Sequence, residues 1–155
     1  MLKLFKCNVF LIYLITFLLI FQELNVLCFQ RSIDDEWFAL RYKPEVIKPG
    51  DNKTFPKIGD DVKMLFVYIH TKTQKELRVS WNKNDPEHVT VGRGYVFKCM
   101  DDSLLRMSKG QKIRIFCSHK YALGAHEDSE SGIHPNMDLF IEMKLLGIVE
   151  KKKDL

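Results

Sequence analysis

The residues that could carry acid–base, metal or nucleophilic chemistry are scattered along this chain. Its five histidines follow no metal-ligand spacing, and we expect them at the surface. Asp101 and Asp102 form a carboxylate pair, but at the expected start of a helix they complement the helix dipole. Gly92-Arg93-Gly94 lacks the third glycine of a phosphate-binding loop. The sequence therefore predicts a protein that uses no metal, nucleotide or other cofactor and no catalytic triad.

Composition and charge are those of an ordinary globular protein. Of the 155 residues, 46% are hydrophobic and 28% are charged, which excludes a disordered, collagen-like or disulfide-dense chain. The net charge of +4 is spread along the sequence rather than clustered, so we expect no nucleic-acid partner.

Residues 1–28 have the layout of a secretory signal peptide. Two lysines precede the apolar run 9–21, and residues 26–28 offer an acceptable cleavage site. An uncleaved anchor is the alternative, but Glu23 falls inside any window of the roughly 20 apolar residues that a membrane span needs. We expect cleavage near residue 28 and no stable membrane association afterwards.

The mature chain is expected to hold one domain, at residues 42–149, after a lead-in at 29–41. Asn52 begins a glycosylation sequon in a turn-like stretch, which is typical of a lumenal surface loop. The charged tail 150–155 resembles an endoplasmic-reticulum retrieval signal in part, with a dilysine signal and a plain charged terminus as alternatives. These features predict a protein of the endoplasmic-reticulum lumen or a secreted one.

Hydrophobic periodicity predicts mostly strands, of which the first is an edge strand that tolerates Pro44. A helix is expected at 95–107, ended by Gly110, and a long polar loop at 124–136. The sum is an α+β fold with an antiparallel sheet and one short helix. The expected strands are at 37–47, 62–70, 77–81, 89–91, 113–117 and 139–149.

Five blocks of sequence resemble the signature blocks of the FKBP-type peptidyl-prolyl cis-trans isomerases, in family order and at family spacing over residues 42–148. The resemblance implies an antiparallel β-sheet curled around one short α-helix. It also implies that the chain isomerises X-Pro bonds in segments of client proteins, as a monomer similar to the small endoplasmic-reticulum members. The blocks are residues 48–59, 91–98, 107–112, 121–124 and 135–146.

Such an isomerase needs an apolar cup that grips proline and favours the twisted amide, whose barrier is about 18–20 kcal/mol. Position by position, the resemblance implies both the cup and the surrounding substrate contacts. The implied catalytic residues are Phe66, Val96, Phe97, Met100, Leu123 and Ile141, and the implied substrate-binding residues are Leu77, Arg78, Glu87 and Ile133.

Several of these positions depart from the family pattern: Phe66 lacks the usual hydroxyl, and Leu77 and Ile141 each replace a phenylalanine. Arg78 replaces an acid, Glu87 an aromatic rim residue, Met100 the tryptophan floor and Leu123 a tyrosine donor. Each lost neutral hydrogen bond is worth about 0.5–1.5 kcal/mol. We therefore expect weakened isomerase activity in the folding of secretory-pathway proteins. The alternative is a catalytically inactive FKBP-like module that holds a partner in the same groove or with the loop 124–136.

Two cysteines remain in the expected mature chain. The resemblance places Cys99 at the helix start and Cys117 on the inward face of the strand beneath it. A bridge requires Cα atoms within about 7 Å, which a sequence does not reveal, and cysteine is often buried as a free thiol. Both states are open, and we expect free thiols.

Overall fold

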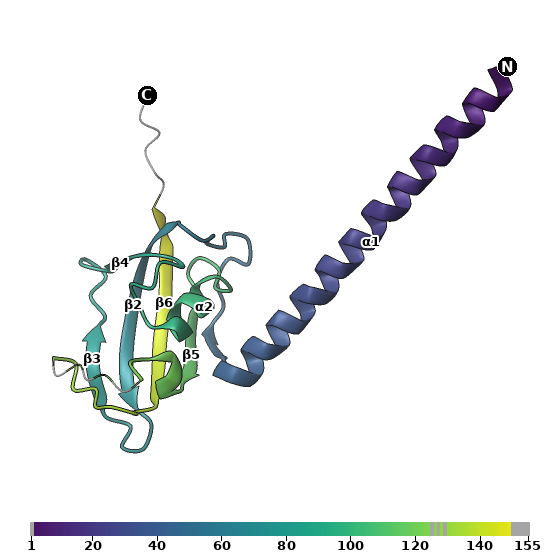
Figure 1. Ribbon diagram of the computed structural model, residues 1–155. Coiled ribbons are helices and arrows are strands. Elements are labelled where there is room, and N and C mark those ends of the chain that lie inside the picture. The colour runs from purple at the N-terminus through teal and green to yellow at the C-terminus, as the bar shows by residue number, and fades with distance from the viewer. Residues whose placement is uncertain (1, 125, 127, 129, 150–155) are drawn as a thin grey trace. The chain divides into compact units, whose positions relative to one another are not determined.

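The computed structural model describes residues 2–124, 126, 128 and 130–149, so the tail 150–155 lies outside the described residues. Two compact units are present, divided between Leu40 and Arg41. The first consists of helix α1, Leu2–Tyr42, whose last residues enter the second unit (Figure 1). Among the described residues, no helix combines the length and the apolar character needed to cross a bilayer.

The expected edge strand at 37–47 is wrong over its first half, because α1 continues to Tyr42. Ala39, Leu40 and Arg41 are strong helix formers. The helix stops where Lys43 takes a φ of 44° and Pro44 follows, since proline disfavours helical backbone in the residue before it. The second half of the prediction is confirmed by strand β1, Glu45–Lys48, which lies at the sheet edge.

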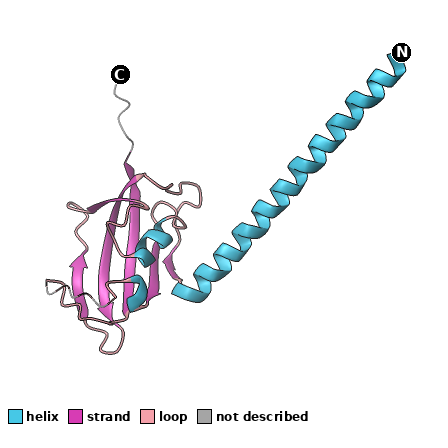
Figure 2. Cartoon of the chain, viewed as in Figure 1, coloured by secondary structure: helices cyan, strands magenta, loops and turns pink. Residues whose placement is uncertain are grey.

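A six-stranded antiparallel sheet forms the second unit and confirms the predicted α+β class. The strands follow the order β1-β5-β6-β2-β3, and β4 pairs with the other end of β2 (Figures 1 and 2). The remaining strands are β2, Asp61–His70; β3, Glu76–Ser80; β4, Glu87–Thr90; β5, Lys112–Cys117; and β6, Leu139–Val149.

Strand β2 is the centre of the core. Its residues from Met64 to Ile69 are all buried, which explains why its sequence is apolar at consecutive positions. On β5 and β6 burial alternates instead, with Ile113, Ile115 and Cys117 buried and their neighbours partly exposed. These two strands therefore present one face to the core.

Helix α2, Lys98–Leu104, is shorter than the predicted 95–107 and is followed later by the short 3-10 helix η1, His119–Tyr121. Gly92 and Gly94 both have positive φ and donate their backbone N–H groups to the Asp101 carboxylate, at 3.0 and 3.1 Å. This turn keeps the residues before Lys98 out of the helix. The buried Asp101 therefore has a structural role beyond the dipole interaction predicted for it.

Candidate functional site

Three aromatic rings form a stack between strand β2 and the start of helix α2. Phe66 and Tyr68 are two residues apart on β2, so they point to the same face of the sheet. The Tyr68 ring lies with its centroid 4.7 Å from that of Phe66 and 5.0 Å from that of Phe97, with interplanar angles of 27° and 25°. Phe66 and Phe97 are two of the expected cup residues, and the structure brings them together through Tyr68.

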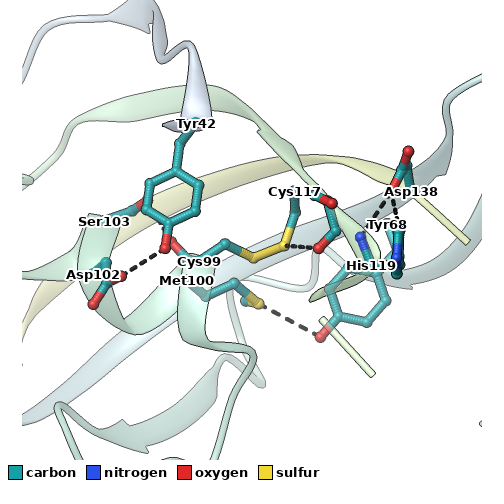
Figure 3. Close-up of a disulfide and its surroundings, with 10 residues drawn as sticks. Tyr42, Tyr68, Cys99, Met100, Asp102, Ser103, Cys117, His119 and Asp138 are labelled. Atoms are coloured by element: carbon teal, nitrogen blue, oxygen red, sulfur yellow. Dashed lines mark hydrogen bonds and ion pairs between the residues drawn. A yellow bond between two sulfur atoms is a disulfide. The ribbon is translucent and has the colours of Figure 1, made fainter. Parts of the chain in front are cut away.

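Tyr68 is the residue that sequence reasoning missed. Its hydroxyl lies 3.6 Å from the Met100 sulfur (Figure 3), and Met100 has no exposed surface. Burial raises the pKa of the Tyr68 hydroxyl above its usual range. The signal that could have found Tyr68 is the two-residue period of β2, which places it on the same face as Phe66.

Two charged residues of the site form an ion pair rather than two isolated charges. Arg78 on β3 is paired in register with Tyr68, and Glu87 on β4 with Met64. Their side chains reach each other with a 3.7 Å contact, and the Arg78 guanidinium also lies 5.7 Å from the centroid of the Phe66 ring. Both side chains keep over a third of their surface exposed, so this pair forms a solvated rim beside the ring stack.

The backbone at the start of α2 faces the same site. Phe97 is the N-cap residue, and its carbonyl accepts the N–H groups of Met100 and Asp101. Within the part of the chain that the structure describes, the Phe97 N–H itself has no acceptor in hydrogen-bond range. Phe97 and Val96 are both partly exposed. The site therefore combines apolar rings with a backbone N–H donor, that of Phe97, which has no acceptor among the described residues.

A disulfide joins helix α2 to the sheet beneath it, which corrects the expectation of free thiols. The sulfurs of Cys99 and Cys117 are bonded, and the Cα atoms lie 5.9 Å apart (Figure 3). That distance is inside the range a bridge requires. The first turn of α2 places Cys99 over the inward face of β5, where the alternation of that strand places Cys117.

Asp102, which follows Asp101 on α2, also accepts hydrogen bonds. Asp102 accepts a hydrogen bond of 2.6 Å from the Tyr42 hydroxyl and one of 3.3 Å from Lys98. Tyr42 is 1% exposed and packs its ring edge-on against Tyr121, with centroids 5.7 Å apart. These contacts hold the segment before β1 and the 3-10 helix η1 close to the helix that carries Met100.

The other expected site residues lie around the stack at different depths. Ile141 is paired in register with Tyr68 and is fully buried, so it supports the rings from within the sheet. Leu77 occupies the irregularity between β2 and β3 and lines a separate cavity of about 410 Å³ with loop residues 130–132. Ile133 is buried by its bridge to Asp128, and Leu123 is half-buried after η1.

Asn52, the sequon residue, is exposed in the turn before β2. Its backbone N–H donates to the Ser108 hydroxyl at 3.2 Å, which leaves the side-chain amide at the surface. Of the scattered histidines, His119 is the first residue of η1, and its ring contacts Asp138, the residue before β6, at 2.9 Å. In the described residues, no group of three or more histidine, cysteine, aspartate and glutamate side chains is placed to hold a metal ion.

Comparison with known proteins gives a consistent result. Residues 52–146 match the family model of the FKBP-type peptidyl-prolyl cis-trans isomerases. The chain is 38% identical over 107 residues to FK506-binding protein 1 of Rhizopus delemar, covering 67% of this chain and 94% of that protein. It is 31% identical over 102 residues to the peptidyl-prolyl cis-trans isomerase Fkbp12 of Drosophila melanogaster, covering 66% and 93%.

Solved structures share the fold. The crystal structure of the three FKBP domains of wheat FKBP73 superposes with a TM-score of 0.64 at 19% identity, over 70% of this chain and 46% of that one. The N-terminal domain of FKBP42 from Arabidopsis thaliana gives 0.62 at 16% identity, over 69% and 85%. The fold expected from the sequence is thereby confirmed.

Proposed function

The chain belongs to the FKBP-type peptidyl-prolyl cis-trans isomerase family, and we propose that it isomerises X-Pro bonds at the ring stack, at a reduced rate, in proteins of the secretory pathway. The observation that carries this proposal is the convergence of Phe66, Tyr68 and Phe97 beside an available backbone N–H. Isomerase activity itself follows from membership of the family.

Isomerisation of an X-Pro bond needs no titratable side chain to act as an acid or a base. Rotation about an X-Pro bond is slow because the twisted amide loses its resonance, and the twisted form is less polar than the planar one. A site that packs the proline ring against aromatic surfaces and excludes water stabilises the twisted form more than the planar form. The Phe97 N–H is placed to donate to a substrate carbonyl and so to hold the segment during rotation.

The reduced rate follows from the rim. Arg78 and Glu87 compensate each other's charge, so neither is free to act as a dedicated partner for the substrate. Leu123 has no hydroxyl to donate, and a lost neutral hydrogen bond costs about 0.5–1.5 kcal/mol, or roughly twofold to tenfold in rate. Some of the relatives are named FK506-binding proteins, and their name states that they bind FK506. We propose that this chain binds it weakly for the same reasons.

The compartment is proposed from three features. The first 28 residues have the layout of a signal peptide, Asn52 is exposed for glycosylation, and a buried Cys99–Cys117 bridge is typical of proteins that fold in oxidising compartments. The tail 150–155 adds a partial retrieval signal but lies outside the described residues.

Glycosylation tests the compartment directly. The full chain is expressed in a eukaryotic cell and treated with a glycosidase that removes N-linked glycans. A mobility shift that disappears in Asn52→Gln supports passage through the endoplasmic reticulum. An unshifted protein whose Cys99 and Cys117 are both reduced would contradict the proposed compartment.

An isomerisation assay tests the activity. The protein is added to a proline-containing peptide together with a protease that cleaves only the trans form, so that slow cleavage of the remaining cis form reports its isomerisation to trans. We expect acceleration that is lost on Phe97→Ala and retained on Lys144→Ala, because Lys144 alternates with the buried residues of β6 and so lies on the other face of the sheet. Equal acceleration by all three proteins would show that the ring stack is not the site.

The second candidate function is a non-catalytic binding module. It is favoured by the complete burial of Met100 and the near-complete burial of Tyr68, which leave little open depth between β2 and α2. Such a module would bind X-Pro peptides without accelerating their isomerisation. Measuring peptide binding and isomerisation on the same sample separates the two candidates.

A further inference from the structure

The space between the Phe66 and Phe97 rings, with Met100 at its base, is called the slot below, and it is already filled. The ring of Tyr68 lies in it, with its centroid 4.7 Å from that of Phe66 and 5.0 Å from that of Phe97. Non-bonded carbon atoms approach no closer than about 3.5 Å, so rings stacked at these distances admit no further group between them. A side chain of the protein itself therefore occupies the slot.

The Tyr68 ring also covers the base of the slot. Its hydroxyl lies 3.6 Å from the Met100 sulfur (Figure 3), and Met100 has no exposed surface. The family resemblance implies that Met100 replaces the floor on which a substrate proline rests. A side chain without accessible surface makes no contact with a bound segment, so Met100 can act as that floor only after the Tyr68 ring has left.

The contacts that hold Tyr68 are weaker than those of a tyrosine built permanently into the core. Among the described residues, the acceptor of its hydroxyl is the Met100 thioether, and a thioether is a weak hydrogen-bond acceptor. Tyr42, by contrast, donates to the Asp102 carboxylate at 2.6 Å.

The slot also lies next to solvent. Arg78, the cross-strand partner of Tyr68, is exposed, and Phe97 is partly exposed. The remaining contacts of Tyr68 are ring stacking on Phe66 and Phe97, which the ring of a bound ligand could replace. The ring of Tyr68 is thus held mainly by contacts for which a ligand competes.

From these contacts we propose that the Tyr68 ring is an internal occupant of the slot, which a substrate or FK506 must displace before it binds there. The inference rests on the proposed function and adds a cause of the reduced rate that is independent of the rim. Only the fraction of molecules with an empty slot is competent to bind, and the apparent affinity is reduced by that fraction. Tyr68 therefore limits binding and isomerisation without touching the bound substrate.

Shortening Tyr68 tests the proposal through a gain. Each stacked pair favours the filled slot by about twofold to tenfold, and Tyr68 makes two such pairs. We expect Tyr68→Ala to tighten FK506 binding in calorimetry and to raise kcat/KM, each by about tenfold. Its urea midpoint should fall at the same time, because a buried ring is lost. Tyr68→Phe keeps the ring and should show no such gain.

Phe140→Ala is the matched control. Phe140 also lies on a strand of the sheet and packs against another ring, that of Phe116 at 5.9 Å. It alternates with Ile141, the cross-strand partner of Tyr68, and so lies on the opposite face of the sheet. Its substitution should lower the urea midpoint and leave the FK506 affinity unchanged. A merely structural role of Tyr68 would give Tyr68→Ala the same result as this control.

A measurement on the unchanged protein avoids the risk that Tyr68→Ala fails to fold. The protein carries ¹³C-labelled tyrosine rings, and a short X-Pro peptide is added until the spectrum no longer changes. Tyr68→Phe identifies the Tyr68 signals by their loss. We expect nuclear Overhauser effects between the Tyr68 and Phe97 rings in the free protein, and we expect them to disappear in the peptide-bound protein.

The outcomes distinguish this inference from the proposed function. If Tyr68→Ala binds FK506 more tightly but neither protein accelerates isomerisation, the proposed function fails and the role of Tyr68 stands. If the unchanged protein accelerates isomerisation while a folded Tyr68→Ala variant neither binds more tightly nor works faster, only the role of Tyr68 is overturned. Contacts between Tyr68 and Phe97 that persist in the peptide-bound protein would likewise overturn it, because the peptide would then bind without emptying the slot.

Discussion

Removing the Cys99–Cys117 bridge should destabilise the domain without changing its fold. Both cysteines are fully buried, and the bridge links the first turn of α2 to the end of β5. The sequence separation is 18, so the bridge closes a loop of about 19 residues. In the chain-entropy model such a loop contributes about 3 kcal/mol to the free energy of unfolding at 25 °C.

Urea denaturation measures this contribution. With a slope of about 2 kcal/mol per M for a domain of this size, the double variant Cys99→Ala/Cys117→Ala should unfold at a midpoint roughly 1.5 M lower than the oxidised protein. The control is the unchanged protein kept with a strong reductant throughout unfolding and refolding. Its midpoint should fall close to that of the double variant, because both then lack the bridge.

Two results would refute this reasoning. One is a midpoint for the double variant within about 0.3 M of that of the oxidised protein. The other is alkylation of both Cys99 and Cys117 in protein unfolded without reductant, read by peptide mapping so that the two N-terminal cysteines are not counted. Either result would mean that the bridge does not link α2 to β5 in the folded chain.

Three further predictions test the site and its surroundings. Phe97→Ala should lower kcat/KM about tenfold or more, because it removes one ring of the stack, while Lys144→Ala has no effect; equal losses would indicate a global effect. FK506 should bind with micromolar or weaker affinity in calorimetry, since Leu123 lacks a donor and Arg78 is paired with Glu87, and nanomolar binding would contradict this. Partial burial raises the pKa of Asp138, but hydrogen bonds from the His119 backbone and ring outweigh it and lower that pKa below its ordinary value. Asp138→Asn should therefore reduce the free energy of unfolding at pH 7, and the difference from the unchanged protein should shrink as the pH falls below 3.8. A difference that does not shrink at all as the pH falls below 3.8 in urea denaturation would show that the charge of Asp138 is not its cause.

The sheet could be predicted because its strands carry strong local patterns. β2 and β6 begin within a residue of their expected positions. The continuous apolar run of β2 and the alternation of β6 are local patterns that predict a strand without knowledge of the tertiary contacts. The end of α1 could not be predicted in the same way. The strand predicted from the β-branched residues of β1 extends across Pro44 to residue 37, whereas residues 37–42 have side chains that favour a helix.

The site shows a different limit. Matching positions to the family pattern identified Phe66, Phe97 and Met100, but that pattern has no functional role for position 68. Only the structure shows that the Tyr68 ring fills the space between the first two and covers the third. The cysteine pair is a similar case, because the 5.9 Å between the two Cα atoms depends on how α2 lies on β5, which no local pattern encodes.

Exchange spectroscopy on a short X-Pro peptide tests the central claim most directly, because it observes cis and trans forms at equilibrium and requires no protease. With the protein at a small fraction of the peptide concentration, the account predicts exchange cross-peaks between the cis and trans signals that are absent from the peptide alone and disappear on Phe97→Ala. Peptide signals that broaden or shift on binding, without such cross-peaks at any protein concentration, would contradict it and identify a binding module instead.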